Sequence, residues 1–441
     1  MAGDWREISL GSSCSKIGSG ATPRGGKESY LGGGTALIRS QNIYNDGFIR
    51  DGLVFIDDKQ ADDLGNVIVE EGDVLLNITG DSVARCCQVA ADVLPARVNQ
   101  HVAIIRPKPG TLDAKFLRYV LVSPLMQEHL LALASAGATR NALTKAMIES
   151  LSISAPHLLE QRAIAHILGT LDDKIELNRR MNATLEAVAR ALFKDWFVDF
   201  GPVRAKMEGH EPYLPREVWD LFQDRLVESE LGAIPEGWET QSLSALLVII
   251  GGGTPKTSVT EYWDGDIPWF SVVDTPATGD VFIIATEKSI TEQGLAGSSA
   301  RLIPKGTAII SARGTVGNLA IAGREMTFNQ SCYGLRGAEG VGDYFVYLTA
   351  QQMVDQLKSM AHGSVFSTIT RQTFEAIQRP VPPAAILRAF ERSVAAWFEA
   401  ILSNVEESRT LAQLRDTLLS KLISGELRVP AAQTQIEEFL T

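Results

Sequence analysis

Apolar residues recur at alternating steps of four and three from residue 156 onward, a spacing that predicts a coiled-coil helix. The seam positions of this helix are Ile164, Leu168, Leu171, Ile175, Asn178, Asn182, Leu185, Ala189, Leu192 and Trp196. A second seam with the same steps follows in the last part of the chain, at Phe390, Val394, Trp397, Ile401, Asn404, Ser408, Leu411, Arg415, Leu418 and Leu422. Two seams of matched length predict that the two helices pack on each other.

Both seams are apolar at their ends and polar in the middle, with Asn178 and Asn404 at equivalent places. A polar seam residue costs stability but fixes the register, because only one alignment pairs it. A helix of about 40 residues would be roughly 60 Å long, so we interpret the pair as a spacer. The alternative is that each helix packs only on its own globular domain.

The regions before the two seams show short apolar runs that start at turns, which predict buried strands. Examples are the runs within 72–80 and 306–314, and His101 to Arg106. Helical spacing follows at 111–135 and at 341–360. Each globular region is therefore predicted to be mixed α/β.

The two globular regions also repeat each other in sequence. The matched segments, in order, are Thr22-Pro23 with Thr254-Pro255, 72–80 with 306–314, Asn99-Gln100 with Asn329-Gln330, and 148–151 with 374–377. The offset between matched segments drifts only slightly along the chain, as loop insertions would cause. Four matches in the same order indicate a duplication.

Composition agrees with a soluble protein of several domains. The 441 residues exceed what one hydrophobic core supports, and 45% of them are hydrophobic. The four cysteines do not make a disulfide framework and predict free thiols in a reducing cytosol. We predict no metal site, because no His/Cys pair has metal-ligand spacing. The first residues lack the layout of a signal peptide, and the longest apolar run, Leu243–Ile250, is too short to span a membrane, so a cytoplasmic location is predicted.

The net charge of −12 argues at first against a nucleic-acid partner. The acidity is uneven, since residues 151–237 carry 10 basic and 15 acidic side chains, whereas residues 1–150 carry 15 and 17. A local basic face on a globular domain therefore remains compatible with the sequence. If DNA is bound, we expect a partner subunit to supply much of the attraction to phosphate.

The motifs of several enzyme classes are missing. The nearest approach to a P-loop has Ala21 at the first glycine position and Glu28 after the lysine, so it fails twice. Adenine methyltransferases need Asn/Asp-Pro-Pro-Tyr/Phe, but Pro382-Pro383 follows Val381 and precedes Ala384. We interpret two carboxylate pairs as solvated loop charges: Asp57-Asp58 and Asp62-Asp63. No catalytic residues are predicted.

Five segments carry a family resemblance. They are Pro156-His-Leu-Leu-Glu160-Gln161, Phe193-Lys-Asp-Trp-Phe-Val-Asp-Phe200, Pro202-Val-Arg-Ala-Lys206, Ser229-Glu-Leu-Gly-Ala-Ile-Pro-Glu-Gly-Trp238 and Leu418-Leu-Ser-Lys-Leu-Ile-Ser-Gly-Glu-Leu427. With the duplicated layout, they make nearly the whole chain resemble the specificity (S) subunit of type I restriction-modification systems.

The resemblance implies an α/β protein with two tandem target-recognition domains, each followed by a long helix, and with the helices paired as an antiparallel coiled coil. The implied ranges are 1–155 and 238–380 for the domains, 156–205 and 381–441 for the helices with the C-terminal tail, and 206–237 for a linker. Each domain would read one half of an asymmetric DNA site, and the helices would set the unread spacer between the halves.

The implied partners are double-stranded DNA, two adenine-N6 methyltransferase subunits that carry S-adenosylmethionine, and motor/nuclease restriction subunits. The chain itself is expected to bind no cofactor and to be non-catalytic. One departure from the first copy lies at the second helix start, where Pro383-Ala-Ala-Ile-Leu387 replaces His157-Leu-Leu-Glu-Gln161. It lacks the acidic residue that favours a helix N-terminus, so the two helix starts are expected to contact the methyltransferase subunits differently.

Base reading favours Arg, Lys, Asn and Gln on rigidly held loops, because these side chains offer bidentate geometry to base edges. Three loops in each copy offer such residues. The residues at these loops differ between the two copies, although the segments that flank them match. The candidates are Arg39, Gln41, Asn42, Ser82, Arg85, Thr139, Arg140 and Asn141 in the first copy, and Ser271, Arg313, Thr315, Asn318, Ser367 and Arg371 in the second. The alternative for each is a polar residue of a turn or cap, and we interpret Asn99 and Gln330 as structural. Two rival functions are a structural adaptor and an enzyme with an unrecognised active site.

Overall fold

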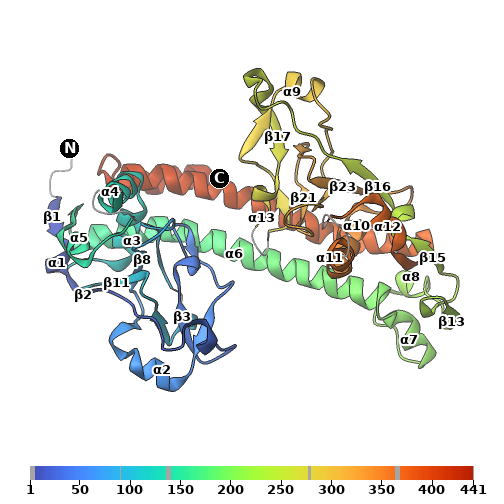
Figure 1. The fold of residues 1–441 in the computed structure, drawn as a ribbon, viewed down its shortest axis with the longest axis horizontal. Coiled ribbons are helices and arrows are strands. Elements are labelled where there is room, and N and C mark those ends of the chain that lie inside the picture. The colour runs from blue at the N-terminus through green and yellow to red at the C-terminus, as the bar shows by residue number, and fades with distance from the viewer. Residues whose placement is uncertain (1–4, 90, 136–140, 277–279, 363–367, 441) are drawn as a thin grey trace. The chain divides into compact units, whose positions relative to one another are not determined.

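The computed structural model describes residues 5–89, 91–135, 141–276, 280–362 and 368–440. The first of two compact units comprises Met1–Ile175 with Thr410–Thr441, and the second comprises Glu176–Arg409. The two long helices, α6 (Leu158–Phe197) and α13 (Ala384–Ile423), each give one part to each unit (Figure 1). The division between the units therefore falls inside the helices.

Two four-stranded sheets form the globular part of the first unit. One is antiparallel, in the order β2 (Cys14–Ser19), β11 (Val102–Pro107), β8 (Val74–Asn77), β9 (Cys86–Gln88). The other has the order β6 (Val54–Ile56), β3 (Thr35–Ile38), β10 (Ala96–Val98), β7 (Ile68–Val69), with β3 and β10 parallel. Two short antiparallel pairs join β1 (Arg6–Ser9) to β12 (Ser152–Ala155) and β4 (Ile43–Tyr44) to β5 (Gly47–Phe48).

The first unit also contains several shorter helices. They are α1 (Leu10–Ser13), α2 (Asp58–Asp63), α3 (Ala114–Val122), α4 (Pro124–Ser135), α5 (Lys145–Ser150) and α14 (Val429–Leu440), with 3-10 turns η1 (Gly26–Ser29), η2 (Ser40–Asn42), η3 (Gly65–Val67) and η4 (Ala91–Val93). A single core joins Ile105 of β11, Phe116 of α3, Leu168 of α6 and Leu418 of α13. The long helices are thus part of the hydrophobic core of this unit.

The second unit contains a five-stranded sheet, a three-stranded sheet and two strand pairs. The five-stranded sheet has the order β16 (Leu247–Gly251), β23 (Cys332–Gly337), β20 (Ala308–Ser311), β21 (Leu319–Ala322), β18 (Phe282–Ile283). The three-stranded sheet has the order β19 (Lys288–Ile290), β17 (Trp263–Phe270), β22 (Thr327–Phe328). The pairs are β15 (Glu239–Ser242) with β24 (Gln378–Val381) and β13 (Leu226–Ser229) with β14 (Gly232–Pro235).

The second unit also contains several shorter helices. They are α7 (Gly201–Met207), α8 (Arg216–Trp219), α9 (Glu292–Ala296), α10 (Asp343–Gln352), α11 (Val354–His362) and α12 (Arg371–Ala376), with 3-10 turns η5 (Leu243–Leu246), η6 (Thr260–Tyr262) and η7 (Val272–Asp274). The segment 206–237, predicted as a linker, folds onto this unit, because Trp219, Phe222 and Ile234 are buried in its core.

Strand register confirms the duplication. In the first unit Ile105 pairs with Ile17 on one side and Val74 on the other. In the second unit Leu335 pairs in the same way with Ile249 and Ala308. Each of these partners is displaced along the chain by the same offset as the repeated sequence segment nearest to it. The two mixed α/β domains therefore share one scaffold.

The two long helices have 40 residues each and bury most positions of the predicted seams. Trp397 is only half-buried, and the next residue, Phe398, is fully buried instead. In the first unit Asp172 of α6 contacts Arg415 of α13, and in the second Asn182 contacts Asn404. Because the partner number falls as the α6 number rises, the helices are antiparallel. The predicted helix pairing and its orientation are confirmed.

The polar centre of the seam pairs across the helices within the second unit. Asn178 is fully buried, and its Nδ2 donates to Glu407 Oε2 at 2.7 Å. Asn404 Nδ2 donates to Asn182 Oδ1 at 2.9 Å. Since a slip of the helices would leave these buried amides unpaired, the asparagines specify one register.

All four cysteines are free and buried, as the sequence predicts. Burial raises the pKa of Cys14 to about 11 and that of Cys332 to about 12.

None of the described helices has both the length and the apolar character that crossing a membrane requires.

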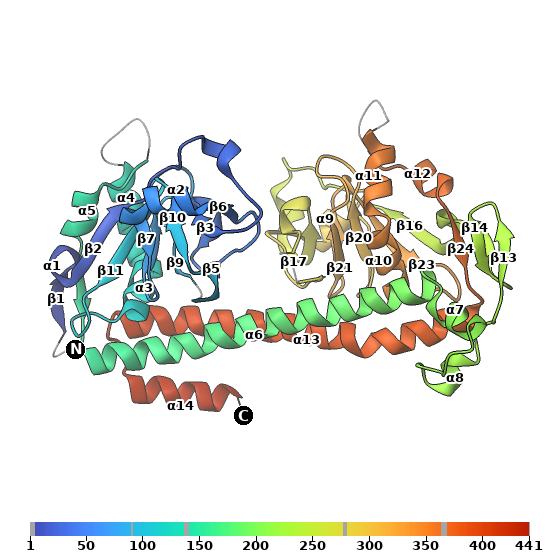
Figure 2. The same cartoon turned by 90° about the horizontal axis from the view of Figure 1, so that it is seen from below.

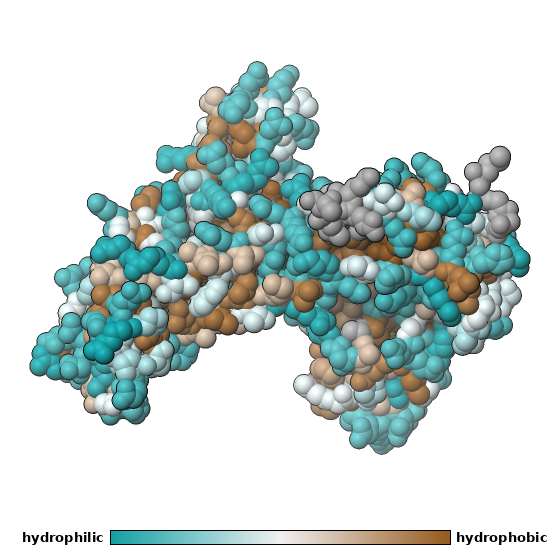
Figure 3. Space-filling model, turned by 180° about the vertical axis from the view of Figure 1, so that it is seen from behind, coloured by the Kyte–Doolittle hydropathy of each residue, from teal (hydrophilic) through white to brown (hydrophobic). Residues whose placement is uncertain are grey.

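Apolar side chains are also exposed beside the seam of α6 in the second unit. Leu177, Met181 and Val188 are 51%, 44% and 43% exposed, and their spacing of four and seven residues places them on one helix face. Figure 3 shows one face of the molecule, on which apolar patches lie among hydrophilic side chains.

Candidate nucleic-acid interface

Three loops meet at one end of the antiparallel sheet in the first unit. The tip loop (78–85) joins β8 to β9, the turn 99–101 precedes β11, and the loop 141–144 precedes α5. The backbone N–H of Ile78 donates to the carbonyl of His101 at 2.9 Å, and that of Gly80 donates to the carbonyl of Asn141 at 3.3 Å. We call this place the loop end of the first unit.

The second unit has the same loop end, formed by the tip loop (312–318), the turn 329–331 and the loop 368–370 before α12. The N–H of Ala312 donates to the carbonyl of Ser331 at 2.8 Å, and the N–H of Ile369 donates to the carbonyl of Ala312 at 3.0 Å. In Figure 2, α5 and α12 each lie on the side of their own unit away from the long helices. The duplicated scaffold thus presents the same set of loops twice.

A 3-10 turn adjoins the tip loop in both units. Asn77 Nδ2, at the end of β8, donates to the carbonyl of Ser40 in η2 at 2.9 Å. In the second unit Asn318 Nδ2 donates to Thr275 Oγ1, directly after η7, at 3.4 Å. The three regions that hold the predicted candidates in each copy are therefore neighbours in space.

Comparison with known protein families identifies the family of this chain. The family described as "Type I restriction modification DNA specificity domain" matches residues 2–187 and 235–406. The chain belongs to this family. Both domains and most of both long helices lie inside the two matched regions, which confirms the resemblance seen in the sequence.

Relatives of similar length carry the same family name. The type I restriction enzyme HindI specificity subunit of Haemophilus influenzae is 29% identical, over 96% of this chain and 100% of its own. The MjaIX specificity subunit of Methanocaldococcus jannaschii is 27% identical, over 94% and 91%. The crystal structure of the type I S subunit from M. genitalium shares the fold, with a TM-score of 0.54 at 18% identity, covering 95% of this chain and 96% of that one.

The candidates at η2 differ in accessibility. Arg39 is half-buried, donates to the carbonyl of Gly52 at 2.5 Å and lies 5.3 Å from the centre of the Tyr30 ring. Gln41 is exposed. Asn42 has no exposed surface, since its Oδ1 accepts the Arg39 N–H and its Nδ2 donates to the carbonyl of Ile49. Asn42 is therefore a capping residue that cannot reach a base, and we remove it from the candidates.

The remaining candidates of the first unit lie on the tip loop and beside it. Ser82 is half-buried, and the half-buried Arg85 guanidinium lies 4.5 Å from the centre of the Tyr44 ring. Asn141 is exposed and accepts the Gly80 N–H through its carbonyl. Thr139 and Arg140 lie outside the described residues.

The candidates of the second unit are mostly accessible. Arg313 and Thr315 are exposed on the tip loop, whereas Asn318 is half-buried at its end. Arg371 is exposed at the start of α12 and donates to the carbonyl of Ile249 at 3.1 Å. Ser271 caps η7 by donating to Asp274 Oδ2 at 3.1 Å. Ser367 lies outside the described residues.

The turns before β11 and β23 contain one structural and one exposed residue each. Asn99 is buried, and its Oδ1 accepts the His101 N–H at 3.1 Å, as Asn329 Oδ1 accepts the Ser331 N–H at 3.0 Å. Asn99 therefore has the structural role expected of it. The next residue in each turn, Gln100 or Gln330, is exposed at the loop end. The sequence analysis left Gln100 out and interpreted Gln330 as structural, whereas both side chains are exposed.

A buried ionic network links the first domain of this specificity-family chain to its helix pair. Asp172 of α6 accepts from Arg118 of α3 at 2.7 Å, from the Tyr119 hydroxyl at 2.6 Å and from Arg415 of α13 at 2.7 Å. Burial alone would raise the pKa of Asp172, but the Arg118 charge and the hydrogen bonds from Arg415 and Tyr119 lower it below its usual value.

The same network reaches the tip loop through short contacts. Arg118 also donates to the carbonyl of Asn45 at 2.7 Å, and Asn45 Oδ1 accepts the N–H of Cys86, the first residue of β9. Gln127 of α4 donates to the carbonyl of Ala84 at 2.9 Å. Ala84 has a φ of 72°, a left-handed conformation that is unfavourable for a residue with a Cβ. Contacts from α3 and α4 therefore hold the tip loop in place.

The two helix starts differ in contacts as well as in sequence. Gln161, buried at the start of α6, accepts the Asp113 N–H at 2.9 Å just before α3. In the second unit Glu391, one turn further along α13, accepts the N–H groups of Tyr344 and Phe345 at 3.1 Å each. Burial raises the pKa of Glu391, an effect that these hydrogen bonds oppose. In both units a side chain of the long helix thus accepts hydrogen bonds from the start of the domain helix, α3 or α10. The residue that does so lies at a different position in each long helix.

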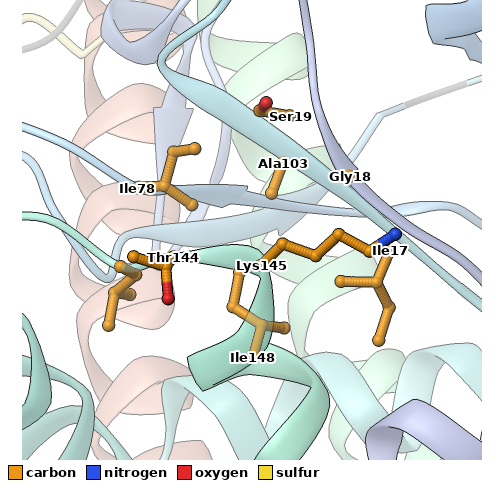
Figure 4. A pocket seen from close by; sticks show the side chains of 9 residues that line it. Ile17, Gly18, Ser19, Ile78, Ala103, Thr144, Lys145 and Ile148 are labelled. Atoms are coloured by element: carbon orange, nitrogen blue, oxygen red, sulfur yellow. The ribbon is translucent and has the colours of Figure 1, made fainter.

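A small pocket lies between β2 and α5 in the first unit (Figure 4). Its volume is about 210 Å³, and most of its lining is aliphatic, including Ile17, Ile78 and Ile148. The Lys145 side chain extends along it toward Ile17. Ligand pockets usually measure about 300–1,000 Å³ and combine apolar walls with several convergent polar groups, so this pocket is packing space beside the loop end.

Proposed function

We propose that this chain is the DNA sequence-recognition subunit of a type I restriction-modification complex, with no catalytic activity of its own. Each target-recognition domain reads one half of an asymmetric, bipartite DNA site. The observation that carries the proposal is the duplicated loop end, in which one scaffold presents different exposed side chains. An asymmetric site requires two recognition domains that share a scaffold but carry different side chains on their loops.

The exposed candidates have the chemistry for base reading. Gln41 and Asn141 in the first unit can offer an amide to a base edge, and Arg313 and Arg371 in the second can offer a guanidinium. Ser82, Arg85, Thr315 and Asn318 add polar groups on the tip loops. Arg39 and Ser271, which already hold neighbouring groups, are proposed to position their loops as well as to contact DNA.

The paired helices are proposed to set the number of unread base pairs between the half-sites. Their buried asparagines specify one register, so the length of the pair has a single value. A helix of 40 residues is about 60 Å long. A paired, register-locked element of that length is suited to act as a spacer.

Docking of two adenine-N6 methyltransferase subunits is proposed at the helices, with motor/nuclease restriction subunits joining for cleavage. The exposed stripe of Leu177, Met181 and Val188 on α6 offers an apolar surface of the kind that protein partners cover. The partners would supply S-adenosylmethionine and catalysis in the cytoplasm. They would also supply positive charge, since this chain carries a net charge of −12.

The test is DNA binding by the chain reconstituted with its methyltransferase subunit. We expect sequence-specific binding whose affinity falls steeply with salt, because phosphate contacts release counterions. The rival is a structural adaptor, in which the domains bind protein. An assembled complex with no preference for any DNA sequence would contradict the proposed function and favour the adaptor.

A further inference from the structure

An exposed glutamine is held by a threonine hydroxyl at the loop end of both units. Thr22 Oγ1 donates to Gln100 Oε1 in the first unit, and Thr254 Oγ1 donates to Gln330 Oε1 in the second. The threonines belong to the repeated Thr-Pro pairs, and the glutamines to the repeated Asn-Gln pairs. This contact is therefore a side-chain interaction that both copies retain at a surface where their other tips differ.

The backbone around each glutamine is tightly constrained. Asn99 and Asn329 fold the turn by accepting an N–H group two residues later. The Thr-Pro loop is pressed against this turn at Gly20 and Gly252, where an added Cβ would overlap the carbonyl of Val98 or of Asn329. The threonine and the glutamine are thus positioned by the scaffold before any ligand arrives.

The hydrogen bond to threonine leaves part of each amide available. A glutamine oxygen accepts two hydrogen bonds and its nitrogen donates two. Threonine uses one acceptor site, and Gln100 Nε2 also donates to His101 Nε2 at 2.8 Å. Gln100 therefore keeps one acceptor site and one N–H, which is the pair that binds adenine N6 and N7 in the major groove. Gln330 keeps an acceptor site as well as its amide donors.

The neighbours of the two glutamines differ. In the first unit His101 Nδ1 lies 2.6 Å from Thr79 Oγ1 of the tip loop. When the two copies are aligned on their repeated segments, the second unit has Ser331 in place of His101 and Arg313 in place of Thr79. The glutamine is thus the common element of two surfaces that are otherwise different.

We propose that Gln100 and Gln330 are equivalent base-reading residues, each contacting one base-paired adenine of its own half-site through the major groove. Thr22 and Thr254 are positioning residues that fix the amide orientation. The inference rests on the proposed function and extends it, because it requires an adenine at the same place relative to each domain. Bases around that adenine differ between the half-sites because the neighbouring side chains differ.

The experiment measures methylation by the reconstituted complex on DNA sites in which each base pair is changed in turn. Q100A should reduce discrimination at one adenine of one half-site by about 5- to 150-fold, the value of one bidentate contact. Q330A should do the same in the other half-site only. Thr22→Val and Thr254→Val, which keep the shape but remove the hydroxyl, should weaken discrimination at the same adenines while leaving the glutamines in place.

The control is Q223A, which removes an exposed glutamine between α8 and β13, outside the loop ends and the long helices. It should leave discrimination at every position unchanged. If the wild-type complex is sequence-specific but Q100A and Q330A keep full discrimination, the inference is overturned and the proposed function stands. Relaxation at a base pair other than A·T, or in both half-sites from one substitution, would also overturn it. A wild-type complex without sequence preference would overturn both.

Discussion

At the scale of single residues, two buried charged side chains have opposite surroundings. Asp172 in the first unit lies among Arg118, Tyr119 and Arg415 and accepts a hydrogen bond from each. Arg379 in the second unit is 5% exposed and forms no ion pair among the described residues. It lies between the rings of Phe193 and Phe345, 5.6 and 5.5 Å from their centres.

Replacing Asp172 by Asn should lower the free energy of unfolding by about 2–4 kcal/mol, because two partly buried guanidinium groups lose their counter-charge. The pKa of Asp172 is lowered in the folded state, so its contribution is complete above about pH 4 and is lost as the pH falls further. Urea unfolding at pH 7 and at pH 3 measures both effects. Asp173→Asn, at the exposed neighbour, is the control, and equal stability of the two variants would refute the role of the network.

Replacing Arg379 by Met should leave stability unchanged within about 1 kcal/mol or increase it, because removing a buried charge that lacks a carboxylate recovers its desolvation cost. Burial lowers the pKa of this arginine to about 10, which reflects the same cost. The first unit has Ile153 at the equivalent strand position, so an apolar side chain suits the scaffold. A loss of more than about 2 kcal/mol in thermal unfolding would mean that the two ring contacts outweigh desolvation.

Individual roles at the loop ends were harder to predict than the loops themselves. The sequence places Asn42 and Gln41 side by side in one polar loop, but only the fold shows that Asn42 caps η2 and is fully buried. Gln330 was interpreted as structural because it recurs, yet its side chain is exposed. Such roles depend on contacts between residues far apart in the chain, as between Thr254 and Gln330, which no local pattern reveals.

At the scale of elements, the spacing of apolar residues in the sequence predicted the long helices and several of the buried strands. Heptad spacing located the buried seams of α6 and α13, and the short apolar runs at 72–80 and 306–314 became β8 and β20. The folded segment 206–237 was missed, because α8 and the β13–β14 hairpin are too short to give a periodic signal. They are stabilised by burying Trp219, Phe222 and Ile234 in the second unit.

Replacing Asn178, Asn182 and Asn404 together by Leu removes both members of the Asn182–Asn404 pair. It should stabilise the helix pair but loosen its register, since an apolar seam pairs equally well in more than one alignment. The expected results are a higher midpoint of thermal unfolding and methylation of sites with more than one spacer length. Sequencing of methylated adenines provides the second readout. Unchanged stability together with a single spacer would contradict the assignment of register to these residues.

Removing one heptad from each long helix should shorten the unread spacer. Seven residues of helix span about 10 Å, which corresponds to about three base pairs at 3.4 Å each. Because a whole heptad keeps the seam in phase, the variant should still fold. Methylation mapping measures the spacer, and an unchanged spacer in a folded, active variant would refute its control by helix length.

At the scale of the whole molecule, duplication explains both what the two halves share and where they differ. Strand register is retained between the copies, as Ile105 and Leu335 show. The link at the long-helix start moved from Gln161 to Glu391, and the tip loops carry different polar residues. On the proposed function, selection for one fold and two half-site sequences accounts for this combination.

The most direct test of the account replaces residues 1–150 by the corresponding domain of another family member that recognises a different site. Methylated adenines are then mapped by single-molecule sequencing with the natural methyltransferase subunit present. The account predicts that one half of the methylated motif changes while the other half and the spacer stay the same. A change in both halves would contradict the claim that each domain reads its own half-site.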